Sequence, residues 1–277
     1  MTKNFILITS RSEKLRITAF GIQNYKLSPC LIFIHGFKGF KDWGFGPYIG
    51  NYFANNGFFV LTFNFSHNGV GDSLTEFIEL DKFANNTFSL EISELSELIS
   101  AYLKGFFGKT ENKKIGLLGH SRGGAIALLT ARQRKEINAV AVWSSVSKLD
   151  RYSERQKKKW MESGVFEVFN SRTKQKMSLN ISLLNDIEEN NDNLLNIKKA
   201  VKELNRPLFI AHGEEDLAVP ITEGELLFKW SDKNLTELFR IKETGHTFNI
   251  KHPFEGSNPK FEMLLDKTNG FYKNNLI

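Results

Sequence analysis

The chain has 277 residues and a formal net charge of +6, with 41% hydrophobic and 25% charged residues, which is the composition of an ordinary globular protein. The length suits one large domain, and 25 phenylalanines predict an aromatic-rich core. A single cysteine excludes an internal disulfide, no apolar stretch reaches the length of a membrane span, and the apolar run at residues 5–8 is too short for a signal peptide, so we expect a cytoplasmic protein.

Short apolar runs alternate with helical patterns along most of the chain. Residues 3–22 alternate in polarity and predict an antiparallel hairpin at a sheet edge, and the apolar residues of 88–104 are spaced for one helical face. Further runs predict helices at 47–56 and after residue 121, and buried strands at 31–35, 58–63, 114–118, 139–143, 207–211 and 237–241. Strands that alternate with helices indicate a mostly parallel central sheet with helices on both faces and right-handed crossovers.

This alternation stops at about residues 145–205, where the sequence is polar and rich in Asn and Lys. We expect a small helical insertion there, within one domain that spans residues 1–277. Most of the net charge lies in this insertion, since residues 148–176 include nine basic residues (148, 151, 155, 157, 158, 159, 172, 174 and 176) and four acidic ones (150, 154, 162 and 167). Apolar residues interleave with them up to position 169, so we interpret the charges mainly as a solvated helix face, with steering of anionic substrates as the alternative.

One glycine-flanked serine has the context of a nucleophile. The segment Gly119-His120-Ser121-Arg122-Gly123 follows a buried strand and precedes an apolar helix. In a G-x-S-x-G turn of this kind the serine lies on a sharp strand-to-helix corner, with its hydroxyl above the sheet. The glycines remove Cβ atoms that would clash where the helix packs back across the strand. Ser121 is therefore the predicted nucleophile.

A serine nucleophile needs a base and an acid that orients the base, and two later segments supply them. Asp216 follows the strand at 207–211 in HGEEDLAVP, and His246 follows the strand at 237–241 in ETGHTF. Both lie at carboxyl ends of predicted parallel strands, where open α/β sheets gather ligands. We predict His246 as the base and Asp216 as the acid. A one-residue difference in the turn would instead select Glu214 or Glu215, and Asp72 and Asp150 are more distant alternatives.

The remaining candidates surround this predicted triad. The strand at 31–35 runs into HGFKG, where the backbone amides of Phe37 and Arg122 are predicted to bind an oxyanion. His35 is interpreted as a structural residue of that loop. His120 and Trp143 are placed to face a substrate pocket, and each also fits a position in the core. The other histidines lack metal-ligand spacing, so we expect no catalytic metal and no cofactor.

The segments HGFKG, NFSHNGVGDS, GHSRGG, HGEEDLAVP and TGHTF follow one another in the order typical of the α/β-hydrolase superfamily, which the chain resembles over its whole length. Through HGFKGFKDWG and GHTFNIKHPF it is most similar to the branch of dienelactone-hydrolase-like proteins and cinnamoyl or feruloyl esterases. Dienelactone hydrolases proper have a cysteine nucleophile, so a serine favours an ester over an enol-lactone. The resemblance implies an α/β-hydrolase fold with a Ser121, Asp216 and His246 triad, and a cap in the insertion.

These patterns predict a serine hydrolase that cleaves carboxylic esters, of small acyl or hydroxycinnamoyl type, through an acyl-enzyme. A peptidase or thioesterase with the same triad is one alternative, and a non-catalytic binding protein on the same fold is another. The expected partner is a small-molecule ester. The basic insertion contains neither a nucleic-acid-reading motif nor a stacking platform, so we expect no nucleic-acid partner.

Overall fold

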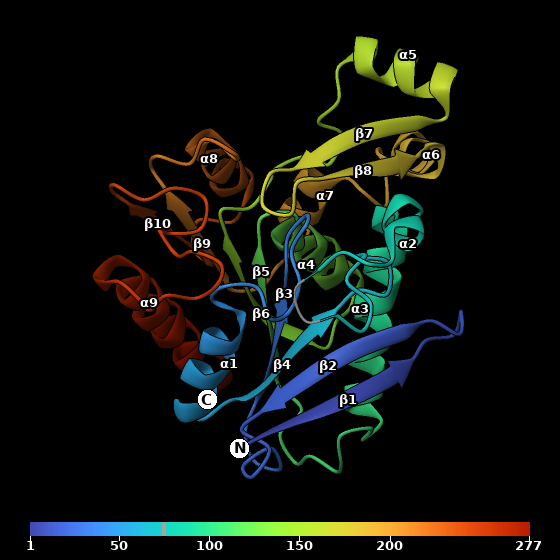
Figure 1. Cartoon of the computed structure of the whole chain (residues 1–277). Coiled ribbons are helices and arrows are strands. Elements are labelled where there is room, and N and C mark those ends of the chain that lie inside the picture. The colour runs from blue at the N-terminus through green and yellow to red at the C-terminus, as the bar shows by residue number, and fades with distance from the viewer. Residues whose placement is uncertain (74–75) are drawn as a thin grey trace.

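The computed structural model describes residues 1–73 and 76–277. An eight-stranded sheet in the order β1-β2-β4-β3-β5-β6-β9-β10 forms its centre, and β7 and β8 pair separately (Figure 1). The strands are β1 (Thr2–Ile8), β2 (Lys14–Phe20), β3 (Cys30–Ile34), β4 (Phe59–Asn64), β5 (Ile115–His120), β6 (Ile137–Trp143), β7 (Val165–Asn170), β8 (Gln175–Asn180), β9 (Leu208–Gly213) and β10 (Thr236–Ile241). The helices are α1 (Gly46–Asn55), α2 (Leu80–Ala84), α3 (Phe88–Leu103), α4 (Arg122–Gln133), α5 (Glu154–Ser163), α6 (Ile181–Asn190), α7 (Ile197–Lys202), α8 (Ile221–Trp230) and α9 (Pro259–Leu276).

The pairing of the central sheet confirms the predicted mostly parallel architecture. The N-terminal hairpin is antiparallel and lies at one edge, since β1 pairs with β2 and β2 pairs in turn with β4. The other neighbours are parallel. Every residue of β3 is buried, as expected for a parallel strand that is covered on both faces.

Helices cover both faces of this sheet. Successive residues of a strand point to opposite sides, so two neighbouring residues of β3 contact the two different layers of helices. Ile32 of β3 belongs to the core cluster that includes residues of α3 and α4, whereas Phe33 belongs to the cluster that includes residues of α1 and α9. Figure 1 shows α1 and α9 together on one side of the sheet. Phenylalanine side chains occur throughout both clusters, which confirms the predicted aromatic-rich core. None of the helices within the described residues is long and apolar enough to cross a membrane.

Between β6 and β9 the chain forms α5, the β7–β8 hairpin, α6 and α7, so its first half is not wholly helical. Ser153 and Gln156 form a capping box at the start of α5, and Gly164, with φ 75°, ends that helix. The helical interpretation of residues 165–169 is wrong, because they form strand β7, in which exposed and more buried residues alternate. Valine and phenylalanine prefer a strand once glycine has stopped the helix. Figure 1 shows the resulting β7–β8 hairpin beyond one end of the central strands.

Candidate active site

Ser121 lies at the corner between β5 and α4. Its φ of 58° and ψ of −124° are unusual for a residue with a side chain and match the strained turn of a nucleophile elbow. A Cβ on Gly119 would lie 2.3 Å from the carbonyl oxygen of Gly123, and a Cβ on Gly123 would lie 2.3 Å from that of Ile34. The close approach of backbone atoms therefore requires glycine at both positions, as predicted from the sequence.

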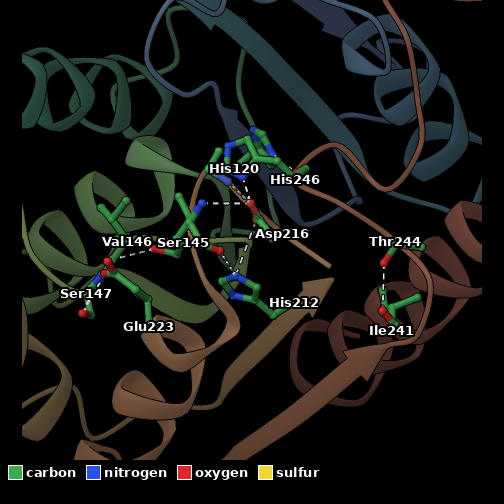
Figure 2. A network of polar contacts seen from close by, with 12 residues as sticks. His120, Ser145, Val146, Ser147, His212, Asp216, Glu223, Ile241, Thr244 and His246 are labelled. Atoms are coloured by element: carbon green, nitrogen blue, oxygen red, sulfur yellow. Dashed lines mark hydrogen bonds and ion pairs between the residues drawn. The ribbon is translucent and has the colours of Figure 1, made fainter. Parts of the chain in front are cut away.

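Asp216 and His246 meet at the carboxyl ends of β9 and β10. The Nδ1 of His246 lies 2.7 Å from the Oδ2 of Asp216. Because an ionised carboxylate only accepts hydrogen bonds, Nδ1 is the donor, and the Nε2 of His246 is left as the proton acceptor. The turn that carries His246 is fixed by the hydroxyl of Thr244, which donates to the carbonyl of Ile241 at 2.9 Å (Figure 2).

The carboxylate of Asp216 is buried and held by several donors. Its Oδ1 accepts hydrogen bonds from the backbone amides of Ala218 and Val219 at 2.9 and 2.8 Å. A second histidine, His212, approaches Oδ2 at 3.5 Å and donates to the carbonyl of Val219 at 2.8 Å (Figure 2). Burial alone would raise the pKa of Asp216, but the hydrogen bonds from His212 and His246 hold that pKa below its ordinary value. Asp216 is therefore ionised under ordinary assay conditions.

The alternative carboxylates lie elsewhere. Glu214 and Glu215 are adjacent to Asp216 in sequence, but both side chains are exposed. Asp72 pairs with Arg16 at 2.7 Å, and Asp150 pairs with Lys157 at 2.5 Å. Among the sequence alternatives, Asp216 is thus the carboxylate that contacts His246.

The two residues proposed as substrate contacts have different surroundings. His120 lines a cavity beside Ser121, and its Nε2 also donates to the carbonyl oxygen of His246 at 2.8 Å (Figure 2). Burial lowers the pKa of His120 to about 3, so this ring is neutral and its proton on Nε2 serves that hydrogen bond. Trp143 lines neither cavity described below: it is fully buried in the core, and its Nε1 donates to Thr268 at 3.1 Å.

Ser121 and His246 both line two cavities. The first, here called the aromatic cavity, has a volume of about 210 Å³. Its walls also include Phe33, Phe37, Lys38, Phe40, Trp43, Phe45, His120, Asn170, Ser171 and Arg172. The second cavity has a volume of about 370 Å³ and also includes Phe37, Lys38, Phe88, Arg122, Val146, Lys148, Leu149, Arg151, Tyr152, Ala218 and Val219.

Ser121 is buried and lines both cavities. Among the described residues none forms a hydrogen bond with its Oγ, and unliganded enzymes often tighten this contact only when substrate binds. The loop after β3 passes directly alongside, since a Cβ on Gly36 would lie 2.9 Å from the Cβ of Ser121. Within the described residues, the backbone amides of Phe37 and Arg122 both lack a hydrogen-bond acceptor. Two unpaired donors thus flank the serine.

Side-chain contacts hold these two amides in place. The guanidinium of Arg122 lies over the ring of Phe37, 4.8 Å from its centroid, and donates to the buried carboxylate of Glu91 at 2.6 Å. The ring of Phe37 also stacks on Phe83. His35 is buried, its Nδ1 donates to the carbonyl of Gly36, and burial lowers its pKa to about 4, so it is a neutral residue of the loop.

The sequence does not predict the residues that surround Ser121, Asp216 and His246. His212 is one of the histidines without metal-ligand spacing, but its place at the end of β9 in HGEED puts it next to Asp216. Arg172 and Lys148 are exposed, as a solvated face predicts, but both also line a cavity. The excess of basic residues was the available signal, but periodicity does not say which of them border the site.

Comparison with known proteins supports the fold. A sequence model for the α/β-hydrolase fold matches residues 29–186, whereas no curated protein sequence matches the chain. The α/β hydrolase GrgF from Penicillium sp. sh18 is 15% identical, with a TM-score of 0.78 and coverage of 100% of this chain and 99% of that one. Est1E from Butyrivibrio proteoclasticus, solved with ferulic acid bound, is 19% identical, with a TM-score of 0.72 and 98% of each chain covered. The Pyrococcus furiosus esterase Pf2001 is 17% identical, with a TM-score of 0.66 and coverage of 100% and 94%.

The matched segment exceeds half of the chain, and it contains both the loop after β3 and the corner at Ser121. The same fold extends over the full length of these solved structures. The chain therefore belongs to the α/β-hydrolase fold family.

Proposed function

We propose that the protein is a serine hydrolase of carboxylic esters. The observation that carries this proposal is the Asp216–His246 hydrogen bond of 2.7 Å, together with the shared position of His246 and Ser121 on the walls of the same two cavities. Esterases among the structures of the same fold make this class of reaction the first to test.

In the proposed reaction Ser121 attacks the ester carbonyl while Nε2 of His246 takes the hydroxyl proton. Asp216 keeps Nδ1 protonated and stabilises the imidazolium that forms. The amides of Phe37 and Arg122 donate to the oxyanion of the tetrahedral intermediate. His246 then returns its proton to the leaving alcohol, and water, activated by the same imidazole, releases the acid and restores the serine.

The aromatic walls of the first cavity suit a substrate with a ring. The rings of Phe33, Phe40, Trp43 and Phe45 line it, and such surfaces favour flat apolar groups. A hydroxycinnamoyl ester is therefore one candidate substrate, in keeping with the ferulic acid bound to Est1E. The insertion between β6 and β9 contributes Asn170, among other residues, to the same cavity, so we assign it the role of a cap over the site.

Kinetics with p-nitrophenyl acetate test this function. We expect a burst of p-nitrophenol of about one equivalent, followed by slower turnover, because acylation and deacylation are separate steps. The Ser121→Ala variant should show neither phase. A parallel panel of thioesters and peptides identifies the preferred bond, and faster cleavage of either class than of any ester would reassign the substrate. Undiminished turnover by Ser121→Ala would contradict the proposal.

A further inference from the structure

The two cavities beside Ser121 are lined by charges of one sign. Their walls include the cations Lys38, Arg122, Lys148, Arg151 and Arg172, and no aspartate or glutamate within the described residues lines either of them. A cleft of uniform charge with apolar walls concentrates ligands of the opposite charge. Whether one of these cations can bind such a ligand depends on whether it is already paired with a carboxylate.

Two of the five cations already have carboxylate partners. Arg122 is bound to Glu91 at 2.6 Å, and Arg151 is bound to Glu223 at 2.8 Å. Asp150, which lies close to Lys148 in sequence, is taken by Lys157 at 2.5 Å. In the part of the chain that the structure describes, this leaves Lys38, Lys148 and Arg172 without a carboxylate.

Lys38 and Arg172 come together in the aromatic cavity from distant parts of the sequence. Lys38 lies in the loop after β3, and Arg172 lies in the turn of the β7–β8 hairpin. The ammonium of Lys38 donates to the carbonyl of Phe169 at 3.0 Å, and the guanidinium of Arg172 donates to the carbonyl of Lys38 at 3.1 Å. These hydrogen bonds use only part of the donor capacity, since an ammonium has three N–H groups and a guanidinium has five.

Aromatic rings orient the guanidinium in this arrangement. Arg172 lies over the rings of Phe40 and Phe77, 5.5 and 5.9 Å from their centroids. Burial, with the neighbouring charge of Arg172, lowers the pKa of Lys38, as expected for two cations held together without a counterion. An anion in the aromatic cavity would relieve this repulsion and occupy the remaining donors.

We propose that the substrate is an anionic ester, whose group in the aromatic cavity carries a carboxylate held by Lys38 and Arg172. This inference rests on the proposed ester hydrolysis and specifies its substrate class. The aromatic walls pack the hydrocarbon part of that group, and the two cations bind its charged end. Lys148 in the second cavity adds positive potential along the other approach to Ser121.

Isosteric ester pairs that differ only in charge test the proposal. On the alcohol side the pair is 4-acetoxybenzoate and 4-acetoxybenzamide, and on the acyl side it is monomethyl terephthalate and methyl 4-carbamoylbenzoate. In at least one pair we expect a kcat/KM about tenfold or more higher for the carboxylate, because charge-assisted hydrogen bonds are the strong ones. Added NaCl should lower kcat/KM for the carboxylate and leave the amide unchanged.

Arg172→Gln identifies the residue responsible. We expect this variant to lower kcat/KM for the carboxylate compound far more than for the amide compound, so that the preference falls close to one. Lys174→Gln is the matched control, because it removes a positive charge from the same turn but lines neither cavity, and it should behave as the wild type. Equal loss on both members of a pair would show that Arg172 only fastens the loop at Lys38, and equal rates in the wild type would also overturn the proposal.

A binding measurement separates this proposal from the proposed function. Calorimetry on the Ser121→Ala variant should give tighter binding of 4-acetoxybenzoate or monomethyl terephthalate than of its amide, and Arg172→Gln should remove the difference. If no ester is hydrolysed by the wild type, the proposed function fails, but this titration still tests the anion site independently of activity. Equal affinity for the carboxylate and amide of both pairs would contradict the anion site.

Discussion

At the scale of single residues, the orientation of Asp216 depends on backbone amides as much as on His246. Asp216 is turned inward because Ala218 and Val219 donate to Oδ1, which leaves Oδ2 for His246. Glu215, one position earlier, points into solvent. The turn therefore distinguishes two neighbouring carboxylates that the sequence alone leaves open.

This difference predicts the outcome of two substitutions. Asp216→Asn should lower kcat by roughly 10³–10⁴-fold, because the amide nitrogen of Asn turned toward Nδ1 no longer accepts its proton and the productive tautomer is lost. Glu215→Gln should leave kcat within about twofold, since its exposed side chain does not contact His246. Steady-state rates with phenyl acetate measure both. A large loss in Glu215→Gln with an active Asp216→Asn would move the acid to position 215.

The places of Ser121 and His246 in the fold were predictable from the sequence, and the contacts around them were not. Both residues follow recognisable strands in a fixed order, so local pattern is enough to place them at the ends of those strands. His212 reaches Asp216 only because the turn folds back on β9, and the hydrogen bond of His120 joins residues 126 positions apart. Contacts of this kind depend on tertiary packing, which periodicity does not encode.

At the scale of secondary-structure elements, an ion pair links α3 to α4 beside the unpaired amides of Phe37 and Arg122. Glu91 on α3 accepts from Arg122 at the first turn of α4 and from Asn86 at 2.7 Å. Both side chains of the pair are largely buried. Removing one member of such a pair leaves an uncompensated charge, whereas removing both does not.

A double-mutant cycle on this pair should therefore be strongly non-additive. Glu91→Leu should lower the free energy of unfolding by about 3–5 kcal/mol, because it leaves the guanidinium of Arg122 buried without a counterion. The double variant Glu91→Leu with Arg122→Leu should be more stable than Glu91→Leu alone. Urea denaturation of the four proteins measures the coupling. Independent, additive losses would contradict a direct buried interaction between the two helices.

The insertion shows where element-level prediction fails. Residues 165–169 mix apolar and charged side chains in a short run that fits either a helix or a strand, and Gly164 decides between them by ending α5. At the start of β8, Gln175 donates to the carbonyl of Phe77 at 2.9 Å and so ties the hairpin to the body of the protein. Arg172, on the turn of this hairpin, is exposed, as expected of a surface charge, and it also lines the aromatic cavity.

At the scale of the whole molecule, residues from four separate segments meet at the carboxyl ends of the central strands. The loop after β3, the corner after β5 and the turns after β9 and β10 bring Phe37, Ser121, Asp216 and His246 together. The alternation of strands and helices was enough to predict that these segments lie at the same end of the sheet, because the carboxyl ends of parallel strands point the same way. That Asn170, Ser171 and Arg172 also reach this end of the sheet depends on tertiary contacts, which the alternation does not encode.

One buried acid away from the site couples the stability of the fold to pH. Glu94 on α3 is held by the amide of Ser66 at 3.0 Å and by its hydroxyl. Burial raises the pKa of Glu94 to about 7 from an ordinary value of 4.5, against the lowering effect of those hydrogen bonds. Between these two pH values the unfolded chain has lost the proton that the folded protein keeps, so this group lowers the free energy of unfolding as pH rises.

Glu94→Gln should remove this dependence, since a glutamine amide reproduces the donor and acceptor of the protonated carboxyl. We expect its free energy of unfolding, relative to the wild type, to increase between pH 4.5 and 7, by at most about 3 kcal/mol. Urea denaturation at several pH values checks this. A difference between the two proteins that is constant across the range would show that Glu94 does not titrate there.

Covalent labelling tests the central claim most directly, because a fluorophosphonate reacts with a serine only when base and oxyanion donors activate it. The probe is added to the folded protein, and the labelled peptide is located by mass spectrometry. The account predicts one modification, on Ser121, that is absent in Ser121→Ala and nearly absent in His246→Ala. Modification at another residue, or no modification of the folded wild-type protein, would contradict it.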